Sequence, residues 1–184
     1  MKNLFRTAAL VSVLAIAVSC GAVIDSSNSS EDLAAKSFDP MAAYPQAKLA
    51  ASGITSGITA ISLSATRKET ASMKSTSSTS FTWVWTVVGA DGMFVDVEVS
   101  PSGAKVIDHE RRMIVAYQAT FEPKNVSVTG TDVLTLAAQQ KSGLPTDLYL
   151  GANVIDSGAS QLRWAVGFAN GEVLVDGDTG DIVK

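Results

Sequence analysis

The chain has 184 residues, of which 46% are hydrophobic and 17% charged, and its formal net charge is −4. This composition fits one ordinary domain or two small ones and excludes a disordered polyelectrolyte, and the negative charge argues against a nucleic-acid-binding protein, which needs a basic face against phosphate. Because the chain has one histidine, His109, and one cysteine, Cys20, a Cys/His zinc cluster and an internal disulfide are excluded as well.

Residues 1–19 have the pattern of a secretory signal peptide. Lys2 and Arg6 form a short basic region, and an almost wholly apolar run follows from Ala8 to Ser19. That run is too short to span a bilayer, which takes about 20 apolar residues, but it has the length of a signal-peptide core. The sequence therefore predicts an exported protein.

The signal segment ends in small residues, Ala17-Val18-Ser19, that lead directly into Cys20. This ending resembles the lipobox of bacterial lipoproteins, in which the cysteine is diacylated and becomes the new N-terminus, although Ala17 stands where that family usually has leucine. The resemblance implies lipidation of Cys20 and attachment to the bacterial cell envelope, on its periplasmic or outer-surface side. The alternative is ordinary signal cleavage beside a bystander cysteine.

Residues 20–38 are rich in serine and acidic residues and are expected to form a flexible tether. An alanine-rich helix is expected next, over 40–51, with Ser52-Gly53 ending it. Alternation of apolar and hydroxyl residues then predicts a strand over 61–66. A serine- and threonine-rich loop is expected over 70–80.

The middle of the chain shows strand periodicity. Apolar alternation predicts a hairpin of 81–88 and 93–99, and a further strand over 104–108. The mixed-charge stretch 108–112, which contains His109, is expected to be a solvated turn rather than a proton shuttle. Another alternating run covers 113–121.

A second helix is expected over 131–142, with Thr131 as its cap and Gly143 and Pro145 ending it. Four strands should follow. Their expected ranges are 148–155, 162–168, 172–175 and 182–183.

The two halves of the chain repeat one order of elements. In each half, a helix ends in Ser-Gly and a strand follows. The next strand contains a tryptophan, Trp85 or Trp164, and ends in a turn whose glycine lies seven residues after the tryptophan. A common order of this kind predicts two copies of one unit, over 39–125 and 126–184. The alternative is chance agreement between short hairpins.

The second half resembles the PepSY module of bacterial envelope proteins. The residues that carry the resemblance are Trp164-Ala165-Val166, Val175-Asp176 and Thr179-Gly180-Asp181-Ile182, within a match over 131–184. A weaker match covers 40–110, where the residues that correspond to Asp176 and Thr179 are missing. The resemblance implies an α+β fold of two tandem units, each a helix packed on an antiparallel sheet. It also implies binding or restraint of secreted peptidases, with no catalytic residues.

Few residues suggest chemistry. Asp176, Asp178 and Asp181 are candidate calcium ligands, but their spacing breaks the alternation that a calcium loop needs, and turn formation explains them equally. Trp83, Trp85 and Trp164 share strand faces with other large apolar residues and are expected in the core rather than in a binding platform. No nucleophile–base pair is apparent, so neither an enzyme nor a cofactor is expected.

The sequence thus favours a lipid-anchored, non-enzymatic envelope protein that binds or inhibits a protein partner, such as a secreted peptidase or another envelope protein. An unpaired sheet edge could accept an extended peptide as an added strand. The alternative is a periplasmic module that binds a small ligand or calcium through the acidic end of the second half. The expected partners are the membrane, through the lipid, and a protein, but not nucleic acid.

Overall fold

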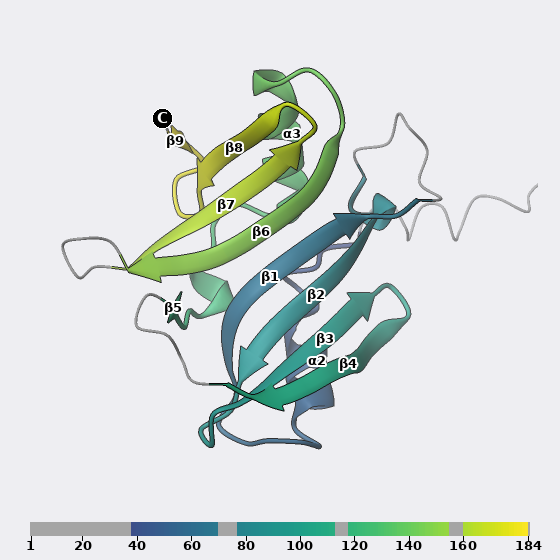
Figure 1. Cartoon of the computed structure of the whole chain (residues 1–184), viewed down its shortest axis with the longest axis vertical. Coiled ribbons are helices and arrows are strands. Elements are labelled where there is room, and N and C mark those ends of the chain that lie inside the picture. The colour runs from purple at the N-terminus through teal and green to yellow at the C-terminus, as the bar shows by residue number, and fades with distance from the viewer. Residues whose placement is uncertain (1–37, 70–76, 113–117, 155–159, 184) are drawn as a thin grey trace, which may run out of the picture.

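The computed structural model describes residues 38–69, 77–112, 118–154 and 160–183, which form an antiparallel sheet with two α-helices on one face (Figure 1). The helices are α2 (Tyr44–Ala51) and α3 (Gly130–Gln140), with two short 3-10 helices, η1 (Ser78–Ser80) and η2 (Pro123–Asn125). The strands are β1 (Thr59–Arg67), β2 (Phe81–Val88), β3 (Met93–Ser100), β4 (Gly103–Arg111), β5 (Gln118–Ala119), β6 (Pro145–Val154), β7 (Ser160–Phe168), β8 (Gly171–Asp176) and β9 (Ile182–Val183).

The sheet has the strand order β4-β3-β2-β1-β6-β7-β8-β9, and β5 pairs with β6 beside this row. A helix followed by four strands occurs twice along the chain, as α2 with β1–β4 and as α3 with β6–β9. The first strand of each set meets the other in the middle of the sheet, where Leu63 of β1 lies opposite Leu150 of β6.

The prediction of two tandem helix-plus-sheet units is wrong, because the strands of both halves form one continuous sheet. Separate units would leave β1 and β6 as long edges with unpaired N–H and C=O groups, and their mutual pairing removes both edges. The start of α3 also packs against the first half. A Cβ on Gly130, at the start of α3, would lie 2.6 Å from Cη2 of Trp83 in β2.

The core lies between the sheet and the helices. One row of paired residues crosses the sheet on this side, and it consists of Val97, Trp85, Leu63, Leu150, Trp164 and Val175. All six are 0% exposed. Trp83 is 1% exposed. The prediction that the three tryptophans pack in the core is confirmed.

The two helices differ in how they begin. In α2, buried Ala43, Ala47 and Ala51 recur every four residues, so they form one stripe of small side chains facing the sheet. In α3, the cap is Thr129 and not Thr131 as expected, because the Thr129 hydroxyl accepts the backbone N–H of Asp132. Small residues therefore let α2 pack closely on the sheet, and a side-chain cap fixes the start of α3.

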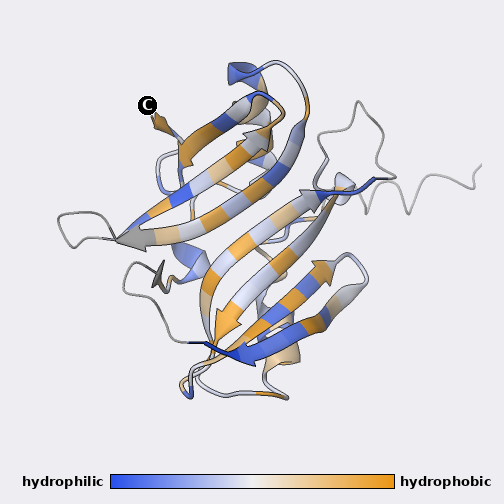
Figure 2. Cartoon of the chain, in the orientation of Figure 1, coloured by the Kyte–Doolittle hydropathy of each residue, from blue (hydrophilic) through white to orange (hydrophobic). Residues whose placement is uncertain are grey.

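The other face of the sheet carries no helix in the described part of the chain (Figure 1). We call it the open face. Apolar and hydrophilic residues alternate along the central strands, as the colours of Figure 2 show, and Ser64, Thr82 and Thr86 are half-buried on the open face. No helix of the described residues is long and apolar enough to cross a membrane.

Some expected segments fall outside the described residues. These are the signal peptide 1–19, the tether up to residue 37, residues 70–76 of the expected loop, residues 113–117 of the alternating run over 113–121, and residue 155 of the strand expected over 148–155. Phe38, the last residue assigned to the tether, instead packs on the core. The end of the expected loop also differs from the prediction: η1 is structured, and the buried carbonyl of Ser78 accepts the indole N–H of Trp83 at 2.7 Å.

Candidate functional site

The most accessible long strand of the sheet is β4, which forms one of its two lateral edges. It has nine residues, whereas β9 at the opposite edge has two. Every residue of β4 from Ile107 onward is exposed. Along the outer side of an edge strand, every second residue directs its N–H and C=O away from the sheet. Thus β4 offers the longest row of free backbone groups in the described structure.

A β-bulge divides β4 into two parts. Val106 lies opposite Val97 and Asp108 lies opposite Asp96, so Ile107 is the extra residue between two regular pairs. The Ile107 side chain is 48% exposed. Bulges and charges both occur on edge strands as protection against unwanted pairing. The part before the bulge, Gly103–Val106, has one charged residue and is the less protected.

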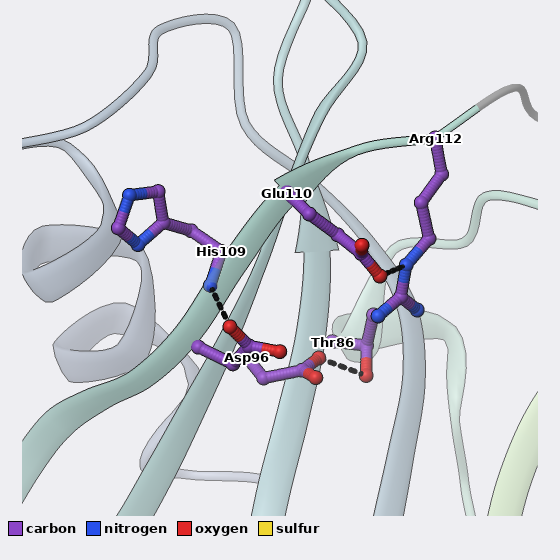
Figure 3. A network of polar contacts seen from close by, with 6 residues as sticks. Thr86, Asp96, His109, Glu110 and Arg112 are labelled. Atoms are coloured by element: carbon purple, nitrogen blue, oxygen red, sulfur yellow. Dashed lines mark hydrogen bonds and ion pairs between the residues drawn. The ribbon is translucent and has the colours of Figure 1, made fainter.

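Carboxylates gather on the open-face side of β4 and its neighbour β3. They belong to Asp96, Glu98, Asp108 and Glu110. Asp96 and Asp108 lie directly opposite each other, and Asp96 accepts a hydrogen bond from the Thr86 hydroxyl at 2.7 Å (Figure 3). Like charges facing each other across strands destabilise the pair. Their repulsion favours a cation nearby.

Two cations lie on the same side. Lys105 lies opposite Glu98, and Arg112 pairs with Glu110 while its guanidinium lies over the Phe94 ring at 5.8 Å. No ion pair reaches Asp96 or Asp108 among the described residues. Four carboxylates against two cations leave this side of the edge acidic.

His109 does not lie in a turn as expected, because residues 108–111 continue β4. It lies opposite Val95, whose side chain is in the core, and so belongs to the helix side of the strand. In Figure 3 its ring points away from the Asp96 carboxylate, and its backbone N–H donates to Oδ1 of Asp108 at 2.8 Å. The sequence pattern failed here because a run of charges also suits an edge strand.

On the helix side, a groove separates α2 from the turn between β3 and β4. Its volume is about 370 Å³. The residues that line it are Gln46, Leu49, Ala50, Pro101, Ser102, Gly103 and Ala104. Leu49 is 75% exposed, the highest value for a large hydrophobic side chain in the described residues. Of the three such exposed side chains among the described residues, Ile107 is thus in β4 and Leu49 lies in the groove beside it.

A polar cluster contacts the C-terminal end of β4 at Arg111. Arg111 lies 3.9 Å from Asp91 in the β2–β3 turn, and the Thr55 hydroxyl donates to Oδ1 of Asp91 at 2.5 Å. This hydrogen bond, with that from the N–H of Met93, lowers the pKa of Asp91 below its usual value. The β2–β3 turn is thereby tied to the segment between α2 and β1.

The three aspartates singled out as calcium ligands take part in a hydrogen-bonded turn. Oδ1 of Asp176 accepts N–H groups from Asp178 and Thr179, both at 2.9 Å, and Oδ2 accepts the Gln161 amide at 2.9 Å. The N–H of Thr179 is the main cause of the lowered pKa of Asp176. Asp181 accepts the Thr179 hydroxyl instead. In the described part of the chain, no three His, Cys, Asp or Glu side chains come together as metal ligands.

A second cavity, of about 360 Å³, lies on the helix side near the middle of the sheet. Asp178 and Glu122 are its two acidic lining residues, and its polar lining also includes Asn125, Thr59, Thr120 and Ser160. The charge of Glu122 also contributes to the raised pKa of Tyr44, for which burial is the larger cause. This cavity is polar and acidic.

The sequence pattern did not identify Leu49 as a surface residue of the expected helix over 40–51. The four-residue spacing of Ala43, Ala47 and Ala51 could have shown this, because it defines a buried stripe that Leu49 does not join. Nothing in the sequence marked Ile107 as a bulge. Cys20, the predicted lipidation site, lies outside the described residues.

Comparison of the chain with protein-family models, curated proteins and solved structures found no match in any of the three.

Proposed function

We propose that the mature chain is a lipid-anchored cell-envelope protein that binds an extended segment of a protein partner along β4, without catalysis. The observation that carries the proposal is the nine-residue edge strand β4 beside the groove of α2, with Leu49 of α2 and Ile107 of β4 both exposed there. Isolated exposed apolar residues need no explanation. Two of them at one open strand edge support a peptide-binding role.

Strand addition gives affinity through main-chain hydrogen bonds and specificity through pockets for alternate side chains. Here β4 supplies the backbone groups, and the groove beside Leu49 supplies a pocket for one or two apolar side chains of the partner. The resemblance of the second half to the PepSY module makes secreted peptidases and other envelope proteins the first partners to examine.

The location follows from the N-terminal sequence. A diacylated Cys20 would hold the domain at a membrane surface, because two acyl chains together give stable anchoring where one does not. Residues 20–37 would then separate the lipid from the sheet. The partner is accordingly expected among proteins of the same envelope.

A site-specific crosslinking experiment tests the proposal in the full-length, membrane-bound protein. A photoreactive residue at position 107 should capture a partner, whereas one at the exposed Glu172 of β8 should not. Leu49→Asp should abolish the capture, and Ala138→Asp, a matched change on the exposed side of α3, should preserve it.

A peptide copied from the captured segment should then slow hydrogen exchange of the β4 amides. Equal capture at both positions, or protection confined to another strand, would contradict strand addition at β4.

The acidic cavity supports a second candidate function, binding of calcium or of a small cationic ligand. The supporting observation is that Asp178 lines a 360 Å³ cavity together with Glu122. Thermal unfolding in millimolar calcium tests it: a rise in melting temperature that Asp178→Ala removes and Glu172→Gln retains would favour this candidate. An unchanged melting temperature would leave calcium without support.

A further inference from the structure

The chemistry of β4 also indicates what kind of strand it accepts. We infer that the partner segment is amphipathic, with apolar side chains toward α2 and basic side chains toward the open face. This inference rests on the proposed function, because it describes the segment that would pair with β4.

The two sides of an added strand meet different surfaces. Successive side chains of a strand point to opposite faces of the sheet, so alternate residues of the segment would point into the groove of α2 and the others over the open face. On the groove side, the segment would meet Leu49, Ala50 and Ala104, which offer methyl and methylene groups and no charge. Apolar side chains suit this side, since burying Leu49 removes apolar area from water.

On the open-face side, the segment would run beside the carboxylates of β3 and β4. Asp108 is on the edge itself, with Asp96 behind it on β3 and no cation paired with either in the described residues. Side chains directly opposite in neighbouring strands have Cβ atoms about 5 Å apart. A lysine or arginine of the added strand would therefore come within ion-pair distance of Asp108 and relieve its repulsion with Asp96.

The bulge at Ile107 separates the apolar contact from the acidic contact along β4. Before Ile107, the groove lies beside Gly103 and Ala104. After it lies Asp108, which is opposite Asp96 and has no ion pair among the described residues. A segment that uses both features needs its apolar anchor beside the first part of β4 and its basic residue beside the second. The exposed Ile107 side chain lies between these two contacts.

Synthetic peptides of about ten residues test the inference with the full mature chain. The first alternates lysine and valine, the second alternates glutamate and valine, and the third has the composition of the first with its lysines and valines in separate blocks. Affinity is measured by titration calorimetry and the binding position by hydrogen exchange. The lysine–valine peptide should bind at β4, about tenfold or more tighter than either other peptide, because only it matches both sides of the edge.

Two variants separate the two sides. The double change Asp96→Asn and Asp108→Asn should lower the affinity for the lysine–valine peptide about fivefold or more and reduce the salt dependence of its binding. Leu49→Asp should also lower this affinity, because it places a charge in the apolar groove, and Ala138→Asp should leave the affinity unchanged. Unfolding curves of each variant confirm that the fold is retained.

The remaining outcomes overturn the inference in distinguishable ways. Tighter binding of the glutamate–valine peptide at β4 would refute the inference that the partner segment is basic, but it would still support strand addition at β4. Equal binding of the block peptide would show charge attraction without strand pairing. Protection of no β4 amide by any peptide would refute the proposed function itself. A concentration-dependent dimer that Asp108→Asn dissociates would identify the occupant as a second copy of this chain.

Discussion

Trp85 and Trp164 each donate an indole N–H to a backbone carbonyl that lies shortly before a helix. Trp85 donates to Pro40, ahead of α2, at 2.9 Å, and Trp164 donates to Val128, ahead of α3, at 3.1 Å. Both side chains are completely buried. A buried indole N–H requires a partner, and in each half that partner ties the entry of the helix to the tryptophan strand.

We expect the two tryptophans to contribute similarly to stability. Trp85→Ala and Trp164→Ala should each lower the free energy of unfolding by about 3–5 kcal/mol, as for other buried aromatic residues. Trp164→Phe should cost less, since it keeps most of the apolar contact and loses the hydrogen bond to Val128. Denaturant unfolding measures all three. A loss below about 1 kcal/mol for either alanine variant would contradict its place in the core.

Local patterns in the sequence were enough to place most strands. The alternation of large apolar residues predicted β2, β3, β7 and β8 with ends within two residues of those observed, because one face of each strand is buried and period two is a local property. The pairing of β1 with β6 is not local. Ser62 and Ser64 make β1 resemble the edge of a small sheet, and only the second half of the chain supplies its other neighbour.

The candidate site was less predictable than the fold. An unpaired edge was expected in general terms, but no pattern identified β4 as that edge, because the charges of 108–112 fit a turn equally well. The exposure of Leu49 depends on which side of α2 faces the sheet. That orientation follows from the buried alanines and from Tyr44, whose ring centroid lies 4.9 Å from that of Trp85, and it leaves Leu49 on the outer side of the helix.

Gly130 allows α3 to start directly against Trp83. Gly130→Ala would normally favour a helix by about 1 kcal/mol, but the added Cβ would lie 2.6 Å from the buried Trp83 ring. We expect a net loss of about 1–3 kcal/mol, as for other overpacked cores. Gly53→Ala is the control, since its nearest neighbour would be 3.8 Å away, and it should be close to neutral. If Gly130→Ala matched wild type in stability, the packing of α3 on Trp83 would be refuted.

The turn at the end of β8 should make stability depend on pH. Hydrogen bonds from Thr179 and Gln161 lower the pKa of Asp176 in the folded state. The stabilisation is therefore complete above the unfolded pKa of about 3.9 and is lost as the pH falls through the folded value. Asp176→Asn should flatten the decline of stability between about pH 5 and pH 2. Glu172→Gln, an exposed carboxylate of the same strand, controls for the loss of charge, and an identical decline in both variants would contradict the assignment.

The anchor of the protein is tested at Cys20. Each buried methylene of an acyl chain contributes about 0.8 kcal/mol, so two chains hold a protein firmly on a membrane and their loss should release it. Cys20→Ser should move the protein from the membrane fraction to the soluble fraction, and mass spectrometry of the wild-type N-terminus should show a diacylated cysteine. Ser19→Gly, which keeps a small residue before the cysteine, should remain in the membrane fraction. Ordinary signal cleavage would instead leave both wild type and Cys20→Ser soluble, and a Cys20→Ser protein that resists a high-salt wash would place the anchor elsewhere in the chain.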